Sequence, residues 1–201
     1  MENKQPFDEQ QGWDIIRRMI DTSRQNIEDD SPYFLIWGWA VLLTALLHYV
    51  LIITKTPYNF LPWPVVMSLT GIFFIFYTRK REQKKRAKSY IDGFLGKMWI
   101  GISITLVASI IVLGSMASFR MAYIVIMMLF SMGAAVTGWV ISFRPLIIGG
   151  MLAWLSSLLL TFIDFPDALL VLAFAITSSY LVPAYLLRSK ALKLRQSAVG
   201  V

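Results

Sequence analysis

Long apolar runs separated by short polar stretches dominate the pattern of the chain. Six such runs cover residues about 34–54, 61–78, 98–116, 121–142, 145–163 and 166–187. A helix needs roughly 17 to 20 apolar residues to cross the hydrocarbon part of a bilayer, and each run is about this long. Proline, which a helix tolerates in its first turn, stands near the start of several runs, at Pro32, Pro62, Pro145 and Pro166. The pattern predicts an all-α integral membrane protein, a bundle of six transmembrane helices.

The polar stretches divide the chain into three parts. We expect a cytoplasmic amphipathic segment over 1–30, a transmembrane domain over 31–188 with a basic cytoplasmic loop at 79–97, and a cytoplasmic tail over 189–201. Only a few residues connect the third, fourth, fifth and sixth runs, which predicts antiparallel packing of sequential helices. Tyr90, Ile91, Phe94 and Leu95 keep a helical spacing ahead of the third run, so either that helix starts early or this stretch lies on the membrane surface.

The distribution of Lys and Arg predicts the orientation. Of 19 such residues, 17 fall on one side of a six-helix arrangement, and Lys55 and Arg120 fall on the other. Cytoplasmic loops carry the excess of positive charge in membrane proteins. We therefore expect both termini on the cytoplasmic side of the membrane.

Composition excludes several classes of protein. Hydrophobic residues make up 57% of the chain and charged residues 15%, whereas an ordinary soluble domain is about half apolar and about a quarter charged. Cysteine is absent, so disulfides, thiolate metal sites and cysteine nucleophiles are excluded. The basic charge is accounted for by the cytoplasmic loops, and we expect no binding to nucleic acid.

Two segments outside the runs are candidate contact surfaces. Residues 11–30 form an amphipathic helical pattern whose apolar stripe includes Trp13, Ile16 and Ile20. This helix either docks a protein partner or a second copy of the chain, or lies flat in the inner membrane interface. The loop carries the basic residues Arg79, Lys80, Arg81, Lys84, Lys85 and Arg86. It either binds anionic lipids of the inner leaflet or serves only to fix the topology.

Chemistry inside the membrane is sparse. No Asp, Glu, Lys or Arg falls at the centre of a run, so the sequence predicts no catalytic residue, no metal site and no cofactor. His48, beside Tyr49, is a candidate for ligand binding or pH sensing, and a hydrogen bond within the bundle is the alternative. Trp154 lies in the middle of a run, where we expect it to pack inside the bundle and to be available to a ligand.

The sixth run contains a polar segment next to a proline. Pro183 cannot donate a backbone hydrogen bond, and Ser179 and Tyr180 lie just before it. The segment either lines a small-molecule pocket or surrounds a proline that is tolerated near the helix end. Small residues four apart, such as Ala134 and Gly138, or Gly149 and Ala153, allow close helix contacts, which we expect within the bundle.

Two stretches carry a resemblance to a known family. The segment from Ser31 through Pro-Tyr-Phe-Leu-Ile-Trp-Gly-Trp-Ala to Leu-Leu-His48-Tyr, and the later Phe143-Arg-Pro-Leu-Ile-Ile-Gly-Gly, resemble small uncharacterised multi-pass membrane proteins of Bacteroidota-type bacteria. The similarity extends from about residue 13 to the C-terminus. It implies an inner-membrane location and transfers no functional residue.

These observations favour a protein that is not an enzyme. We expect a regulatory, sensory or accessory membrane subunit that acts through contacts with proteins or lipids. The alternative is a small-molecule transporter or the substrate-binding subunit of one, for which this chain length suffices.

Overall fold

The computed structural model describes residues 12–14, 31–82, 90–116 and 119–199, and their regular structure is entirely helical. This confirms the all-α class. The helices of the bundle are α2 (Ser31–Ile53), α3 (Pro62–Glu82), α4 (Tyr90–Ser115), α5 (Phe119–Val140), α6 (Arg144–Leu159), α7 (Ala168–Ile176), the π-helix η1 (Thr177–Leu181) and α8 (Val182–Val199).

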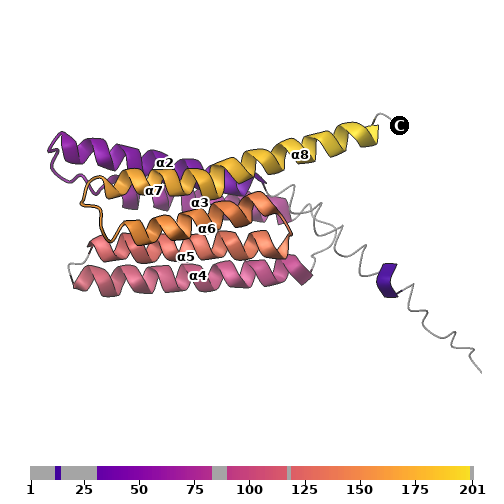
Figure 1. The fold of residues 1–201 in the computed structure, drawn as a ribbon, viewed down its shortest axis with the longest axis horizontal. Helices are drawn as coiled ribbons and strands as arrows, with labels where there is room; N and C mark the ends of the chain where they lie inside the picture. Colours follow the sequence, from indigo (N-terminus) through magenta and orange to yellow (C-terminus); the bar gives the residue numbers. More distant parts are fainter. Residues whose placement is uncertain (1–11, 15–30, 83–89, 117–118, 200–201) are drawn as a thin grey trace, which may run out of the picture.

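The helices α2 to α7 run in alternating directions along one bundle axis, and η1 and α8 continue α7 in the same direction (Figure 1). The start of α2 and the end of α8 therefore lie at the same end of the bundle, and α8 extends beyond it. The helix α6 packs closely against α5 on one side and against α7 and η1 on the other, while α2 packs against α3, α7, η1 and α8. The helix α4 lies at one edge and packs against α5.

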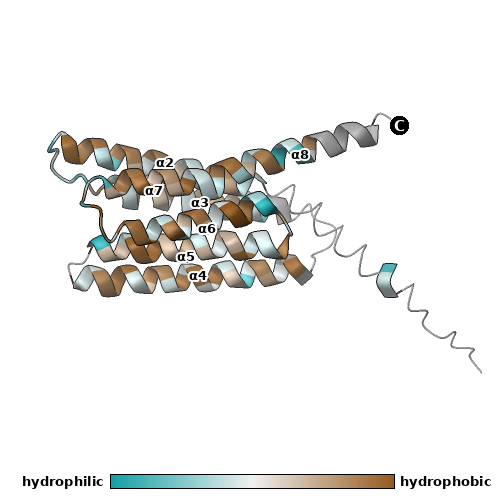
Figure 2. Cartoon of the chain, in the orientation of Figure 1, coloured by the Kyte–Doolittle hydropathy of each residue, from teal (hydrophilic) through white to brown (hydrophobic). Residues whose placement is uncertain are grey.

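Four helical stretches are long and apolar enough to cross a membrane: Ser31–Ile53, Gly93–Ser115, Arg120–Val140 and Ala168–Lys190. Large apolar side chains cover their outer surfaces, and Ile104 of α4, for example, is 65% exposed. Hydrophilic residues gather at helix ends and connections (Figure 2). An outer surface of this kind is suited to lipid, because such large apolar patches are rare on soluble monomers.

The two remaining predicted spans differ from these four for identifiable reasons. The helix α6 is apolar but has only 16 residues. It ends at Leu159 and not at 163 as predicted, because the chain turns through residues 160–163. Arg120 of α5 donates hydrogen bonds to the carbonyl oxygens of Leu160, Thr161 and Ile163 and so fixes this turn. The helix α3 continues past Thr78 into the basic segment, so its last turn is charged.

Two helices end in the same backbone motif without glycine. Beyond α5, Ser142 has a φ of 54°, and the N–H groups of Phe143 and Ser142 bond to the carbonyls of Gly138 and Trp139. Beyond α2, Lys55 has a φ of 52° and takes part in the equivalent pair of bonds. Both are Schellman motifs, in which glycine usually occupies the left-handed position.

The last span, expected over 166–187, contains a π-helical segment. It begins at Ala168, widens to a π-helix at Thr177–Leu181 and continues as α8 to Val199. Pro183 is therefore well inside the helix, and the prediction that it is tolerated near a helix end was wrong. The helix α4 begins at Tyr90, so the third helix starts early, which was one of the two alternatives predicted for residues 90–95.

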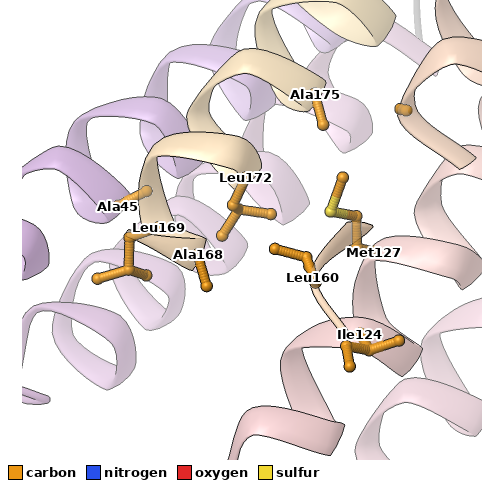
Figure 3. Packing of buried hydrophobic residues seen from close by; sticks show 9 residues of the cluster. Ala45, Ile124, Met127, Leu160, Ala168, Leu169, Leu172 and Ala175 are labelled. Carbon is orange, nitrogen blue, oxygen red and sulfur yellow. The ribbon is translucent and has the colours of Figure 1, made fainter. Parts of the chain in front are cut away.

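The buried core is built largely from small and branched side chains. In the cluster of Figure 3, Ala45 of α2 lies beside Leu169 of α7, and Leu160 lies beside Ile124 and Met127 of α5. Leu160 and Leu169 are each 1% exposed. Alanines at the helix contacts allow the backbones to approach, while leucines fill the space between α2, α5 and α7.

Candidate functional site

His48 lies buried on α2, close to the connection with α3. The indole N–H of Trp63, at the start of α3, donates a hydrogen bond to His48 Nδ1 over 2.9 Å. The hydroxyl oxygen of Tyr123 on α5 lies 3.3 Å from the same nitrogen. The expectation that His48 is hydrogen-bonded within the bundle is confirmed, and its role towards a ligand stays a prediction.

The Trp63 contact fixes the state of the imidazole. An indole N–H can only donate, so Nδ1 must offer its lone pair, and the ring is neutral with its proton on Nε2. Asn59, in the connection between α2 and α3, lies beside the imidazole. Protonation of His48 would remove the acceptor that holds Trp63.

Aromatic rings surround the imidazole at this end of the bundle. The ring centroid of Phe165, in the connection between α6 and α7, lies 5.7 Å from that of His48. Trp63 and Tyr123 are 5.6 Å apart, and Tyr123 and Phe165 are 5.8 Å apart. We call His48, Asn59, Trp63, Tyr123 and Phe165 the His48 cluster. The His48 cluster joins α2, α3 and α5 to the α2–α3 connection and the α6–α7 connection.

Tyr49 follows His48 in sequence and shares a core cluster with Trp63 and Tyr123, although no hydrogen bond or ring contact between Tyr49 and the imidazole is seen among the described residues. Its half-buried side chain packs against the core cluster that contains Ala45 and Leu169. Its predicted part in ligand binding is untested.

Ser179 and Tyr180 lie in η1 and are both 2% exposed. The Ser179 hydroxyl donates to the carbonyl oxygen of Ala175 over 2.7 Å, and the Tyr180 hydroxyl donates to the carbonyl oxygen of Phe130 on α5 over 3.2 Å. Thr177 and Ser178 likewise bond to carbonyls of their own helix. The polar segment predicted from sequence therefore stabilises the widened turn and ties it to α5.

The structure does not bring Ser179 close to His48. Helices rise about 1.5 Å per residue, so Ser179 lies about 17 Å along the axis from Ala168, whereas His48 lies about 8 Å from Ile53 at the same end. The aromatic neighbours also differ, since Tyr180 contacts Phe34 and Phe130. The two predicted polar positions belong to separate layers of the bundle.

Trp154 is 46% exposed on the outside of α6, so the expectation that it packs inside the bundle was wrong. The buried face of α6 consists of small residues together with one leucine, and it includes Gly149, Gly150 and Ala153. That face lies too close to neighbouring backbone to hold an indole ring.

Glycines give α6 its close contacts. An added Cβ at Gly149 would overlap the carbonyl oxygen of Ser178, and one at Gly150 would lie 2.7 Å from the backbone nitrogen of Ala135. At Gly138 of α5, an added Cβ would lie 2.7 Å from the backbone nitrogen of Ile147. Packing of the small residues within the bundle is confirmed.

The contact with Ser178 follows from the π-helix. The N–H of Val182 donates to the carbonyl of Thr177, five residues earlier. In the same register, the donor for the Ser178 carbonyl would be Pro183, which has no N–H. The Ser178 carbonyl faces Gly149 on α6, where weak C–H···O contacts between helices are common.

A second aromatic group, unforeseen from sequence, lies nearer the end where α2 begins. The ring of Trp37 lies 5.8 Å from that of Phe130 and 6.3 Å from that of Phe74. Trp99 of α4 contacts the other side of this group, with its ring 6.1 Å from Phe130. We call Trp37, Phe74, Trp99 and Phe130 the Trp37 cluster. Within the part of the chain that the structure describes, the indole nitrogen of Trp37 is buried without a hydrogen-bond partner.

The predicted contact residues are described only in part. Trp13 is 66% exposed, and Arg79 and Lys80 are exposed at the end of α3. Arg81 continues that helix. Ile16, Ile20, Lys84, Lys85 and Arg86 lie outside the described residues, so their predicted roles are untested.

The ranges 12–14, 31–82, 90–116 and 119–199 contain no group of three His, Cys, Asp or Glu residues arranged to hold a metal ion. Comparison with known proteins yields no similarity from which to assign a role: no protein-family model, no curated protein and no solved structure matches the chain.

Proposed function

We propose that the chain is a non-enzymatic subunit of a bacterial inner membrane, with a regulatory, sensory or accessory role exerted through contacts with proteins and lipids. The observation that carries this proposal is the use of the interior polar groups. Of the buried residues best suited to a ligand, His48 and Tyr180 bond to other helices of the bundle and Ser179 bonds to a carbonyl of its own helix. An interior used for packing favours action through the surface.

The proposal includes six membrane crossings, with the π-widened last helix counted once. The alternating helix directions and the charge distribution support it. At the end where α2 begins lie the basic residues Arg79, Lys80, Lys97, Arg144 and Arg188, whereas Lys55 and Arg120 lie at the opposite end. By the positive-inside rule, this arrangement supports a topology with both termini in the cytoplasm. The resemblance to Bacteroidota-type membrane proteins supports the inner membrane.

The segment over 11–30 is the proposed protein contact, because its apolar residues Trp13, Ile16 and Ile20 recur at helical spacing and Trp13 is exposed. The test is affinity recovery of the full chain from its native membrane in mild detergent, with mass spectrometry of co-purifying proteins. Combined substitution of Trp13, Ile16 and Ile20 by serine should remove a stoichiometric partner or reduce the oligomer size.

The matched control substitutes Asp14 and Asp21, on the opposite face of the same segment, by serine. This variant should keep the partner. If wild type and both variants recover the same partner proteins and have the same oligomer size, the proposal loses its main support.

A second candidate, a small-molecule transporter or substrate-binding subunit, is favoured by η1, because π-helical turns frequently occur at functional sites. A specific ligand stabilises the folded state, so it should raise the unfolding temperature of the purified chain. Alanine at His48 or Ser179 should abolish the shift if these residues bind the ligand. A screen of soluble metabolites without any shift would count against this candidate.

A further inference from the structure

We propose that His48 is a proton-binding site, and that its protonation exchanges the hydrogen bond from Trp63 for one to Tyr123 and opens this end of the bundle. The inference deepens the proposed sensory role by naming the stimulus, which is acid, and it rests on the proposed function for the meaning of the response. Two observations carry it: the pair of polar groups at one ring nitrogen, and the helix connections that meet at the ring.

The switch depends on the atom Nδ1 of His48. The indole nitrogen of Trp63 lies 2.9 Å from it, and the hydroxyl oxygen of Tyr123 lies 3.3 Å from it. An indole N–H can only donate, whereas a phenol hydroxyl can donate or accept. Neutral Nδ1 therefore accepts from Trp63. When Nδ1 gains a proton from water, its new N–H opposes the indole N–H, and the Tyr123 oxygen is already in place to accept from it.

The charged groups near the ring favour opening of the cluster after protonation. Among the described residues, no carboxylate lies within hydrogen-bond or ion-pair distance of the imidazole, and Asp164 pairs with Arg120 over 3.6 Å. The titratable groups on the surrounding elements are Tyr49 of α2, Lys55 and Tyr58 of the α2–α3 connection, Arg120 and Tyr123 of α5, and Asp164 and Asp167 of the α6–α7 connection. The helix α7 carries none. On α3, η1 and α8 the first titratable groups are Tyr77, Tyr180 and Tyr185, towards the other end of the bundle.

An imidazolium in the closed cluster thus has no counter-charge. A buried charge without a partner is costly, so the protonated ring favours an arrangement that water can reach. Acid then shifts the population towards the open arrangement, because that arrangement binds the proton more tightly.

Opening at His48 affects two helix connections. Phe165 of the α6–α7 connection packs on the imidazole with its ring centroid 5.7 Å away, and Asn59 of the α2–α3 connection lies beside the imidazole. The ring of Trp63, at the start of α3, lies 5.6 Å from that of Tyr123 on α5. Loss of the Trp63 bond therefore frees the start of α3 from α2, and the two connections can separate.

The hydrogen bond can be followed directly, because the chain has a single histidine and seven tryptophans. The indole N–H resonances of the isotope-labelled full chain in detergent are recorded by NMR from about pH 8 to about pH 4, a range that spans the ordinary pKa of histidine. The Trp63 resonance, assigned by its loss in Trp63→Phe, should move as the pH falls. The Trp39 resonance should stay, since that indole donates to the Tyr185 hydroxyl and not to an imidazole.

Spin labels measure whether the connections separate. Tyr58→Cys and Phe162→Cys place one label in each connection, at positions 70% and 84% exposed, in a chain without native cysteine. Electron paramagnetic resonance should give a longer mean distance between the labels at the acid end of the range than at the neutral end. His48→Asn is the matched variant, because its amide oxygen can accept from Trp63 and does not bind a proton in this range. It should keep the neutral-pH resonance and distance throughout.

A Trp63 resonance that does not respond to pH in wild type would overturn the proposal, and so would an equal response in His48→Asn. A response of the resonance without a change in label distance would overturn the separation of the connections. In detergent both ends of the bundle meet the same pH, so these results do not depend on membrane orientation or on partner recovery. The proton switch and the proposed protein contact can therefore fail separately.

Discussion

Trp63 donates its indole N–H to Nδ1 of His48 and thereby ties the first turn of α3 to the last part of α2. Between them the chain makes a connection of eight residues, from Thr54 to Leu61, that also supplies Asn59. The bond is local in sequence, yet Tyr123 and Phe165 extend its influence to α5 and to the connection between α6 and α7.

The first prediction concerns this bond. His48→Leu should lower the free energy of unfolding by about 1 kcal/mol, because it leaves the half-buried indole donor of Trp63 without its acceptor. Thermal unfolding of the purified protein in detergent measures the change. The double variant His48→Leu, Trp63→Phe should lose less stability than the sum of the losses in the two single variants. Strict additivity of the losses would show that the bond contributes nothing to stability.

The second prediction concerns the contact between α6 and η1. Gly149→Ala should destabilise the protein by about 1 to 3 kcal/mol, since the new methyl group meets a backbone carbonyl that has little room to move. Gly101→Ala on α4 is the control, because nothing lies within 4 Å of a Cβ at that position. Equal unfolding temperatures for the two variants would contradict the close approach of α6 to Ser178.

The third prediction concerns the left-handed residue beyond α5. Ser142→Gly should raise the stability by about 1 kcal/mol, because glycine adopts a positive φ without the steric cost that a side chain incurs. Ser142→Ala should give no such gain, since alanine meets the same clash. A similar gain from both substitutions would mean that the side chain and not the backbone conformation limits stability.

The fourth prediction concerns topology. The chain contains no cysteine, so single cysteines can be introduced without removing native ones. Tyr58→Cys and Phe162→Cys, at positions 70% and 84% exposed, should react with an impermeant thiol reagent from outside the cell. Arg79→Cys and Arg188→Cys should react only after permeabilisation.

The six-crossing proposal depends on all four positions. Labelling of Arg79→Cys in intact cells would mean that α3 does not cross the membrane. Labelling of Tyr58→Cys and Phe162→Cys from different sides would be incompatible with an even number of crossings between them.

The positions of the helices could be predicted from sequence, because a membrane helix needs a long apolar run and prolines mark the first turns of α2, α3 and α6. Their ends could be predicted less well. The early end of α6 depends on Arg120, 40 residues before Leu160, and no local pattern reports such a contact.

The side-chain groups were harder to predict. His48 was recognisable as the one ionisable residue within a predicted span, and Trp63 follows it across a short connection. Their pairing could have been predicted by packing the first two helices antiparallel. Trp37 and Trp39 look alike in sequence, since both lie near one membrane boundary. Only the fold makes the nitrogen of Trp37 buried while Trp39 is 42% exposed, because α2 turns one of them towards α5.

The packing of α2 against α7, η1 and α8 has a consequence for biogenesis. Apart from α3, the neighbours of α2 are α7, η1 and α8, which are synthesised only after α3, α4, α5 and α6. Until then, the face of α2 at Gly38, which lies against Tyr180 and Leu181, is without its final cover. Completion of the bundle must therefore wait for the synthesis of α7, η1 and α8, and a chain that stops after α6 should be recognised by quality-control proteases instead of accumulating as a stable fragment.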